Sequence, residues 1–436
     1  MTDPKNYTIG WICALTTELI AAQALLDQRH DMPEWIPVND NNTYVLGQMG
    51  KHSVVIAALP QGEYGLVNAA TVARDMVRSF PNVRLGLMVG IGGGAPSKTH
   101  DIRLGDVVVS VPGNGNGGVF QYDYGKTVQD QKFTVTGHLN QPPQAILGAL
   151  STLKADYVTD GHSIERTIDD LLQRKPRLQR KFKRPDDSTD VLYHSEFTHQ
   201  AGPNEDCLVV CGNNESNIVA RAEGTEGRDK IKIHYGLIAS ANQLMKDARV
   251  RDRLSEEMHV LCFEMEAAGL MNHFPCLAIR GICAYSDTHN NKRWQGYAAM
   301  TAAAFAKDLL RYIAQNRIEA ERSLSDAMKD VRGDINSMRI SVDGVKDDQH
   351  LNKLRTWLSA PDFSTNFNTS NQLLRSASLG IQDIFPLRND EIGEDVKACI
   401  LSRFQTSEQL KRWQNRPDVQ EEIVTSLMEK SNGMFR

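Results

Sequence analysis

The sequence predicts an α/β fold whose sheet is covered by helices on both faces, followed by a charged, helix-prone extension. Over the first 110 residues, short apolar segments alternate with amphipathic ones, as is typical of strands and helices that share one sheet. The chain of 436 residues is also too long for one typical core, and its composition becomes more charged from about residue 316. We therefore expect one large α/β domain and an appended segment.

Elements in the first quarter of the chain follow from their apolar periodicity. We expect strands over residues 7–14, 43–48, 52–59, 84–89 and 106–111. We expect helices over residues 16–27, with Thr16 as the N-cap, and over residues 65–79. A glycine cluster, Gly90–Gly94, follows the fourth of these strands.

The middle of the chain, residues 113–235, has weaker periodicity and contains a basic run at 174–184 that we interpret as a solvated face. Regular structure resumes near residues 230–245. We expect strands over 259–265 and 276–284, a helix over 266–273, and a long helix over 295–315 that closes the domain.

Composition and charge exclude several classes of protein. A net charge of −5 argues against a nucleic acid partner, because proteins that bind the phosphate backbone are basic. The sequence contains neither an apolar run long enough for a membrane helix nor an N-terminal signal peptide, so we expect a cytoplasmic protein without a membrane partner. Seven scattered cysteines indicate reduced thiols. Cys207 and Cys211 are four residues apart, but two further ligands at a suitable spacing are lacking, so we expect no metal.

The glycine cluster nominally satisfies the dinucleotide-binding fingerprint, but its context does not. That fingerprint requires a helix directly after the glycines and an acidic residue about 20 positions later. Here Pro96 and a second strand follow instead. The cluster is either a cradle whose backbone N–H groups face a ligand or a tight turn alone.

Four acidic residues stand where strands end or helices begin. Glu264 and Glu266 could accept hydrogen bonds from sugar hydroxyls, or could be a solvent-facing residue and a helix N-terminal acid. Asp287, after Ser286 at the end of a strand, could protonate a leaving group or could cap a turn. Glu18 alone is typical of a surface residue that complements a helix dipole.

Seven motifs taken in order resemble the purine nucleoside phosphorylase/uridine phosphorylase superfamily, and within it methylthioadenosine/S-adenosylhomocysteine nucleosidases. They are IGWICALTTEL, VGIGGGAP, RLGDVVVS, YDYGK, GLIASANQLMKD, FEMEAAGL and AYSD. The resemblance covers residues 7–315, with an atypical stretch at about 128–205. It implies a three-layer α/β/α fold with a mixed central sheet, a homo-oligomer, and cleavage of the N-glycosidic bond of a purine nucleoside or nucleotide, adenine being the expected base, without a cofactor.

The resemblance also implies roles for individual residues. Asp287 would protonate purine N7, Glu266 would hold the ribose hydroxyls, and Glu18 would activate the attacking water. Met265 would pack under the sugar. The nucleophile pocket would be lined by the backbone of Ile91, Gly92 and Gly93. Glu264, Met245 and Ser286 would also contact the substrate, together with Leu244, which stands where these nucleosidases often place an aromatic residue on the base.

Water is the expected nucleophile. Related phosphorylases place an arginine just before the glycine cluster, whereas Leu87-Met88-Val89 stands here. Glu18 would in addition repel phosphate. A phosphate-dependent phosphorylase remains the alternative enzyme, and a non-catalytic nucleotide-sensing or assembly domain remains the alternative of another class.

The C-terminal part resembles segments that flank the NACHT module of fungal NOD-like receptor proteins. The similar segments are 354–362 and 429–436, and no GxxxxGK[ST] motif lies between them. The resemblance implies a charged helical linker over 316–349 and a remnant over 350–436 without the NTPase core. This context suggests an immune effector whose substrate could be ATP. Arg103, Lys292 and Arg293 are candidates to bind phosphates, or are solvated surface residues.

Overall fold

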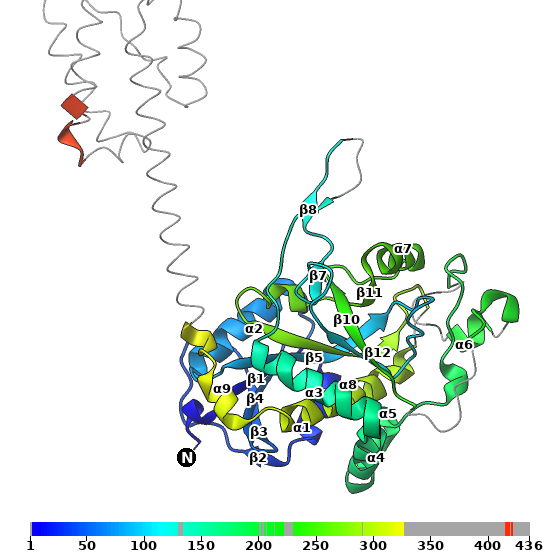
Figure 1. Cartoon of the computed structure of the whole chain (residues 1–436), viewed down its shortest axis with the longest axis horizontal. Coiled ribbons are helices and arrows are strands. Elements are labelled where there is room, and N and C mark those ends of the chain that lie inside the picture. The colour runs from blue at the N-terminus through cyan, green and yellow to red at the C-terminus, as the bar shows by residue number, and fades with distance from the viewer. Residues whose placement is uncertain are drawn as a thin grey trace, which may run out of the picture. The chain divides into compact units, whose positions relative to one another are not determined.

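A computed structural model describes residues 2–129, 134–199, 202, 205, 207–212, 214–221, 230–289, 291–326, 415–418 and 420–421 (Figure 1). The chain divides into two units, Met1–Arg332 and Gly333–Arg436. The fold and the candidate site below belong to the first unit. The NACHT-like segments and most of the predicted linker lie outside the described residues.

One mixed ten-stranded sheet forms the centre of the first unit. Its order is β11-β10-β6-β12-β5-β1-β4-β3-β2, and β7 pairs with β10. The strands are β1 (Ile9–Cys13), β2 (Gln28–His30), β3 (Tyr44–Met49), β4 (His52–Ala58), β5 (Leu85–Gly94), β6 (Val107–Ser110), β7 (Val119–Gln121), β10 (Ile233–Ser240), β11 (Val260–Glu264) and β12 (Cys276–Ala284). A separate hairpin pairs β8 (Gly125–Lys126) with β9 (Thr134–Val135).

The directions of the strands confirm the predicted mixed sheet. β4, β1, β5 and β12 run parallel, whereas β6 is antiparallel to β12. β10 and β11 run parallel to β6, and β11 also pairs antiparallel with the end of β5. This last pairing closes part of the sheet into a ring of strands.

Helices surround the sheet, as predicted. They are α1 (Thr16–Ala24), α2 (Leu66–Ser79), α3 (Gln144–Asp160), α4 (Ile164–Arg174), α5 (Gln179–Phe182), α6 (Cys207–Val210), α7 (Ala248–Met258), α8 (Gln295–Arg311) and α9 (Gln315–Ala320). α2 packs where Gly10 of β1 has no side chain, since a Cβ there would meet Met76. On the opposite face, Gly281 of β12 lets the backbone of α8 approach at Ala298.

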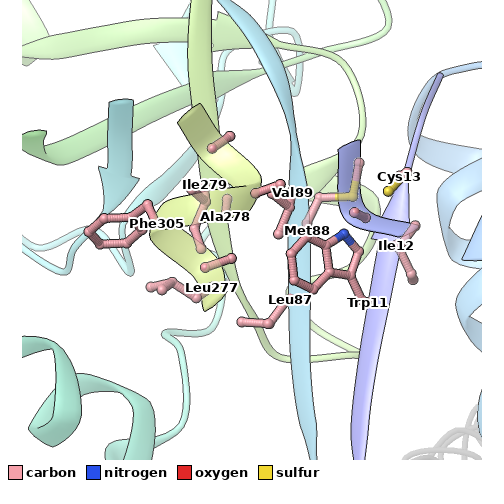
Figure 2. Close-up of a cluster of buried hydrophobic side chains, with 14 of the residues drawn as sticks. Trp11, Ile12, Cys13, Leu87, Met88, Val89, Leu277, Ala278, Ile279 and Phe305 are labelled. Atoms are coloured by element: carbon pink, nitrogen blue, oxygen red, sulfur yellow. The ribbon is translucent and has the colours of Figure 1, made fainter. Parts of the chain in front are cut away.

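A large part of the core lies between the sheet and α8. Trp11, Leu87 and Leu277 are in register on β1, β5 and β12. Figure 2 shows these side chains in one cluster with Ile279 and with Phe305 of α8. All five are completely buried, which explains why these strands read as continuous apolar runs.

Local predictions differ from the structure at three points. Leu15, and not Thr16, is the N-cap of α1, and the Glu18 carboxylate accepts from its N–H at 2.9 Å. The glycine cluster is not a loop but the last five residues of β5, because β12 and β11 both pair with it. The helix predicted over 266–273 is only the 3₁₀ turn η5 (Ala267–Gly269).

Two further expectations concern the surface. The basic run at 174–184 is mostly exposed, apart from the buried Phe182. In the part of the chain that the structure describes, every helix is too short or too polar to cross a membrane.

Candidate functional site

The ends of four strands bring the predicted site residues together. β1, β5 and β12 are parallel, so their carboxyl ends lie at one edge of the sheet, where α/β proteins bind ligands. β11 reaches the same glycines from the opposite direction, with Phe263 opposite Gly93. The residues at or just after the ends of these strands are Glu18, Glu264, Glu266, Ser286 and Asp287.

Glu18 is buried rather than on the surface. Its Oε2 accepts from the N–H groups of Ala14 at 2.7 Å and Leu15 at 2.9 Å, and its Oε1 accepts from Ile91 N at 2.7 Å. Burial raises the pKa of Glu18, while Arg280 and the three N–H donors act in the opposite direction. An ionised carboxylate has about four acceptor positions, so Glu18 keeps roughly one on Oε1 for a ligand or a water molecule.

Gly90 allows this arrangement, because a Cβ at this position would overlap both Glu18 Oε1 and Arg280 Nη1. Arg280 comes from the middle of β12 and is completely buried. Its Nη2 donates to Glu264 Oε2 and lies 3.6 Å from Glu266 Oε2. One guanidinium therefore balances three buried carboxylates, those of Glu18, Glu264 and Glu266.

Glu264 has an internal role. Its carboxylate accepts from Glu266 N at 3.0 Å and from Ala267 N at 3.0 Å, in addition to Arg280. These bonds hold the first turn after β11. Since its acceptor positions face the protein, Glu264 has little capacity left for a sugar.

Glu266 is held more loosely. Its Oε1 accepts from Gly65 N and its Oε2 from Met265 N, both at 3.3 Å. Burial raises the pKa of Glu266 to about 7, with Glu264 and Glu18 adding to the effect and Arg280 opposing it. Of the two acids in FEMEAAGL, Glu266 is therefore the one with acceptor capacity for a ligand.

Ser286 and Asp287 lie at the end of β12. Ser286 adopts φ 54°, a region that non-glycine residues rarely occupy, and its buried Oγ packs against Gly93 without a hydrogen-bond partner among the described residues. Asp287 is also buried; its Oδ1 accepts from His289 N at 2.9 Å, and its Oδ2 lies 3.8 Å from Arg251 Nη1. Burial raises the pKa of Asp287, while His289 and Arg251 oppose the shift.

The other predicted residues lie at the margin. Met265 is half-buried, and Met245 packs beside the cluster that contains Phe263. Leu244 is 66% exposed, so it does not line a closed base pocket here.

The predicted phosphate-binding cations lie outside the buried cluster as well. Arg103 donates to Asp101 at 2.9 Å, which offsets its charge. Lys292 and Arg293 are exposed on the 3₁₀ turn η6 (Lys292–Trp294).

Sequence reasoning missed Arg280 and Arg251. The signal for Arg280 was an arginine within the otherwise apolar strand CLAIRGICA, which must pair with a buried acid. It also missed the surroundings of Cys207 and Cys211. The structure brings His199 and His289 to these two thiols, and the four potential ligand atoms lie within 4.8 Å of one another. The prediction that no further ligands are available is corrected, because His289 is 78 residues beyond Cys211 and only the fold brings them together.

Comparisons with known proteins give a relative by sequence and several similar solved structures. No protein-family model matches the chain. Over 321 residues the chain is 44% identical to a nucleotide-binding leucine-rich repeat (NLR)-like protein of Hyaloscypha variabilis, an alignment that covers 73% of this chain. It spans only 30% of the length of that relative. The predicted resemblance to NOD-like receptor proteins is confirmed by this relative.

Solved structures similar to the chain include two from Helicobacter pylori. They are futalosine hydrolase, with 15% identity, and 5′-methylthioadenosine/S-adenosylhomocysteine nucleosidase, with 14% identity, each at a TM-score of 0.44. The corresponding nucleosidase of Neisseria meningitidis is 14% identical with a TM-score of 0.43. Each covers 70% of this chain and 98% of its own length.

Proposed function

We propose that this chain hydrolyses the N-glycosidic bond of a purine nucleoside or nucleotide and releases the free base, with adenine as the expected base. The observation that carries the proposal is the convergence of Glu18, Glu266 and the glycines of β5 at one edge of the sheet. Ser286 joins them through its packing on Gly93, and Asp287 follows it. The motif resemblance assigns these same residues to glycosidic cleavage.

The residues are suited to the chemical steps. Cleavage passes through an oxocarbenium-like sugar, so it needs a positioned nucleophile, a contact to the hydroxyls and protonation of the leaving group. Glu18 orients the water with its remaining acceptor position. Glu266 accepts from the ribose hydroxyls, and Asp287 protonates or hydrogen-bonds purine N7.

The spacing along β5 supports this division of roles. Glu18 is bonded to Ile91 N, and Ser286 packs on Gly93, two residues further along the strand. Two residues of extended chain span about 7 Å, which is on the scale of a ribose with its base. The water beside Glu18 and the base beside Asp287 would therefore lie on opposite faces of the anomeric carbon of the sugar.

The charges favour water over phosphate as the nucleophile. Three carboxyl groups surround the single guanidinium of Arg280, so acidic groups outnumber basic ones in the pocket. A phosphate dianion placed beside Glu18 would be repelled. This balance supports hydrolysis over phosphorolysis.

We extend the proposal to the number of phosphates on the substrate, with ATP as a candidate. The relative of this chain is named for nucleotide binding, which motivates ATP as a substrate beside adenosine. Of the three predicted cations, Lys292 and Arg293 are exposed, and we propose that they contact the phosphates. Release of adenine from ATP would suit an immune effector that depletes nucleotide.

Chromatography of reactions with adenosine, AMP and ATP tests the proposal. We expect free adenine in phosphate-free buffer, and a loss of rate of about 10²–10⁴-fold in Asp287→Asn, since a general acid contributes that much. Glu256→Gln, which changes an exposed carboxylate on α7, is the matched control and should keep the wild-type rate.

Two outcomes would overturn the proposal. Release of base only when phosphate is present, with ribose 1-phosphate as the second product, would identify a phosphorylase. Absence of release from every purine substrate, with adenine nucleotide still bound, would favour a sensing or assembly domain.

A further inference from the structure

We propose that His199, Cys207, Cys211 and His289 bind one zinc ion in a closed structural site. These residues lie outside the carboxylate cluster, and none of their side chains is assigned a step in the proposed reaction. Their ligand atoms, two imidazole nitrogens and two sulfurs, are all within 4.8 Å of one another. The inference rests on this geometry and is independent of whether the chain is a hydrolase.

The separations between ligand atoms fit a tetrahedral ion. His199 Nδ1 lies 3.2 Å from both Cys207 Sγ and Cys211 Sγ, and Cys211 Sγ lies 3.5 Å from His289 Nδ1. Zinc bonds of about 2.3 Å to sulfur and 2.0–2.1 Å to nitrogen, at tetrahedral angles, place ligand atoms about 3.3–3.8 Å apart. The other three pairs of ligand atoms lie within 4.8 Å, so each would have to contract by about 1 Å at most.

Both histidines present the correct nitrogen. His289 Nε2 lies 3.0 Å from the carbonyl of Phe197, and His199 Nε2 lies 3.2 Å from the carbonyl of Gly202. A carbonyl can only accept, so each Nε2 carries the proton and each neutral ring directs the lone pair of Nδ1 toward the sulfurs. Metal-bound histidines characteristically donate their other N–H to a carbonyl or carboxylate in this way.

The two cysteines are arranged by one turn of helix. Cys207 opens α6, and Cys211 N donates to the Cys207 carbonyl at 2.8 Å, so the two side chains share one face. Both thiols are buried. Two thiolates would neutralise a divalent cation, which permits the ion to be buried without a further counter-charge.

Aromatic packing holds the His289 ring in place. Tyr193 stacks on it with a centroid distance of 4.0 Å, and Phe197 lies parallel at 5.5 Å. A ring held by these aromatic contacts loses little further freedom when it binds a metal, and an apolar shell excludes competing water.

The ligand set identifies the ion and its role. Two sulfurs and two imidazoles in a tetrahedral array are typical of Zn²⁺, whereas Mg²⁺ and Ca²⁺ require oxygen ligands. Four protein ligands leave no position for water or substrate, which makes the site structural. The ion would join His199 and the two cysteines of α6 and its end to His289 in the loop after β12.

Metal content of the full-length chain, purified without a histidine tag, tests the proposal. We expect about one zinc per chain, as structural sites of this type hold one ion. After chelation, added Co²⁺ should give the visible absorption of a tetrahedral complex and a sulfur-to-cobalt charge-transfer band. In Cys207→Ser and in His199→Gln, metal affinity should fall by at least about 10–100-fold, the loss typical of even an outer-shell change.

His194→Gln is the matched control, since His194 is an exposed histidine in the same segment and lies outside the cluster. It should retain the wild-type zinc content. Two results would overturn the proposal even if the variants fail to fold. One is a Co²⁺ spectrum of the wild-type protein without the sulfur-to-cobalt charge-transfer band. The other is a Cys207–Cys211 disulfide, found by mass spectrometry of the freshly purified protein. Unchanged zinc content in folded Cys207→Ser would do the same.

Discussion

Two buried polar clusters in this chain are built in different ways. The carboxylate cluster, Glu18, Glu264, Glu266 and Arg280, is positioned by the ends and middle of regular strands. The thiol cluster, His199, Cys207, Cys211 and His289, comes from one short helix and irregular chain. A sheet brings strand ends together by its topology, whereas irregular segments need their own cross-link, such as the proposed zinc ion.

Asp287 lies between the two clusters. It accepts from His289 N on one side, and its neighbour Ser286 packs on Gly93 on the other. If the thiol cluster is a structural site, it positions the acid that the carboxylate cluster requires. This dependence lets changes in one cluster be compared with changes in the other.

Breaking the carboxylate cluster should have the largest effect on stability. Arg280→Met leaves buried carboxylates uncompensated, and removal of one partner from a buried ion pair costs about 3–5 kcal/mol. The free energy of unfolding, measured by urea denaturation, should fall by that amount.

Arg166→Met is the control for this change. Arg166 pairs with Asp170 at 4.0 Å on the exposed face of α4, so its loss should cost at most about 1 kcal/mol. Equal decreases in the free energy of unfolding for the two variants would show that Arg280 does not stabilise the buried carboxylates.

Removing metal should break the second cluster with a smaller effect. An ion present at 100 times its dissociation constant stabilises the folded state by about 2.7 kcal/mol. Chelator should therefore lower the Tm of the wild-type chain by several degrees. His199→Gln lacks a ligand, so it should have the lower Tm from the start and show no further change in Tm with chelator. If chelator lowers the Tm of this variant as much as that of the wild type, the stabilising metal is bound elsewhere.

The carboxylate cluster was the more predictable of the two. Glu18 and Glu266 each follow a strand that its apolar run predicted, but it was the resemblance to nucleosidases that implied a shared site. What stayed open was how each acid is satisfied. Only the structure shows that Glu264 is occupied by backbone N–H groups and by Arg280.

The thiol cluster could not be found by spacing. Cys207 and Cys211 suggest a metal only with two more ligands, and His289 is separated from them by β10, α7, β11 and β12. Irregular chain carries no periodicity from which its path can be predicted. The glycine cluster illustrates the converse, because glycines suggested a loop where strand pairing on both sides extends β5.

The pH dependence of binding should distinguish Glu266 within its cluster. Its pKa of about 7 lies above the ordinary value of 4.5, so below pH 7 the carboxyl is protonated and accepts hydrogen bonds from ribose less well. KM for adenosine should fall as pH rises from 6 to 8. Below the pKa of Glu266 the decrease should be at most about tenfold for each pH unit. The same shift makes the contribution of Glu266 to folding stability greatest at low pH and lost as pH rises through 7.

Two comparisons sharpen that prediction. 2′-Deoxyadenosine lacks one of the hydroxyls that Glu266 would bind, so its KM should depend less on pH. Glu266→Gln cannot ionise, and its KM should be independent of pH over this range. A wild-type pH profile retained in this variant would assign the titration to another group.

The smallest expected effect concerns the surface cations beyond Asp287. Lys292 and Arg293 are exposed on η6, where a contact to a phosphate would be screened by water and salt. If the two side chains contact the phosphates of ATP, Lys292→Ala and Arg293→Ala should each raise KM for ATP by about two- to fivefold. This corresponds to an exposed ion pair of up to about 1 kcal/mol. KM for adenosine should stay unchanged. The ratio of the two KM values at low and at high salt measures this contact. Equal changes for adenosine and ATP would instead mean that the two residues act on the loop that carries Asp287, and would leave the phosphates in solvent.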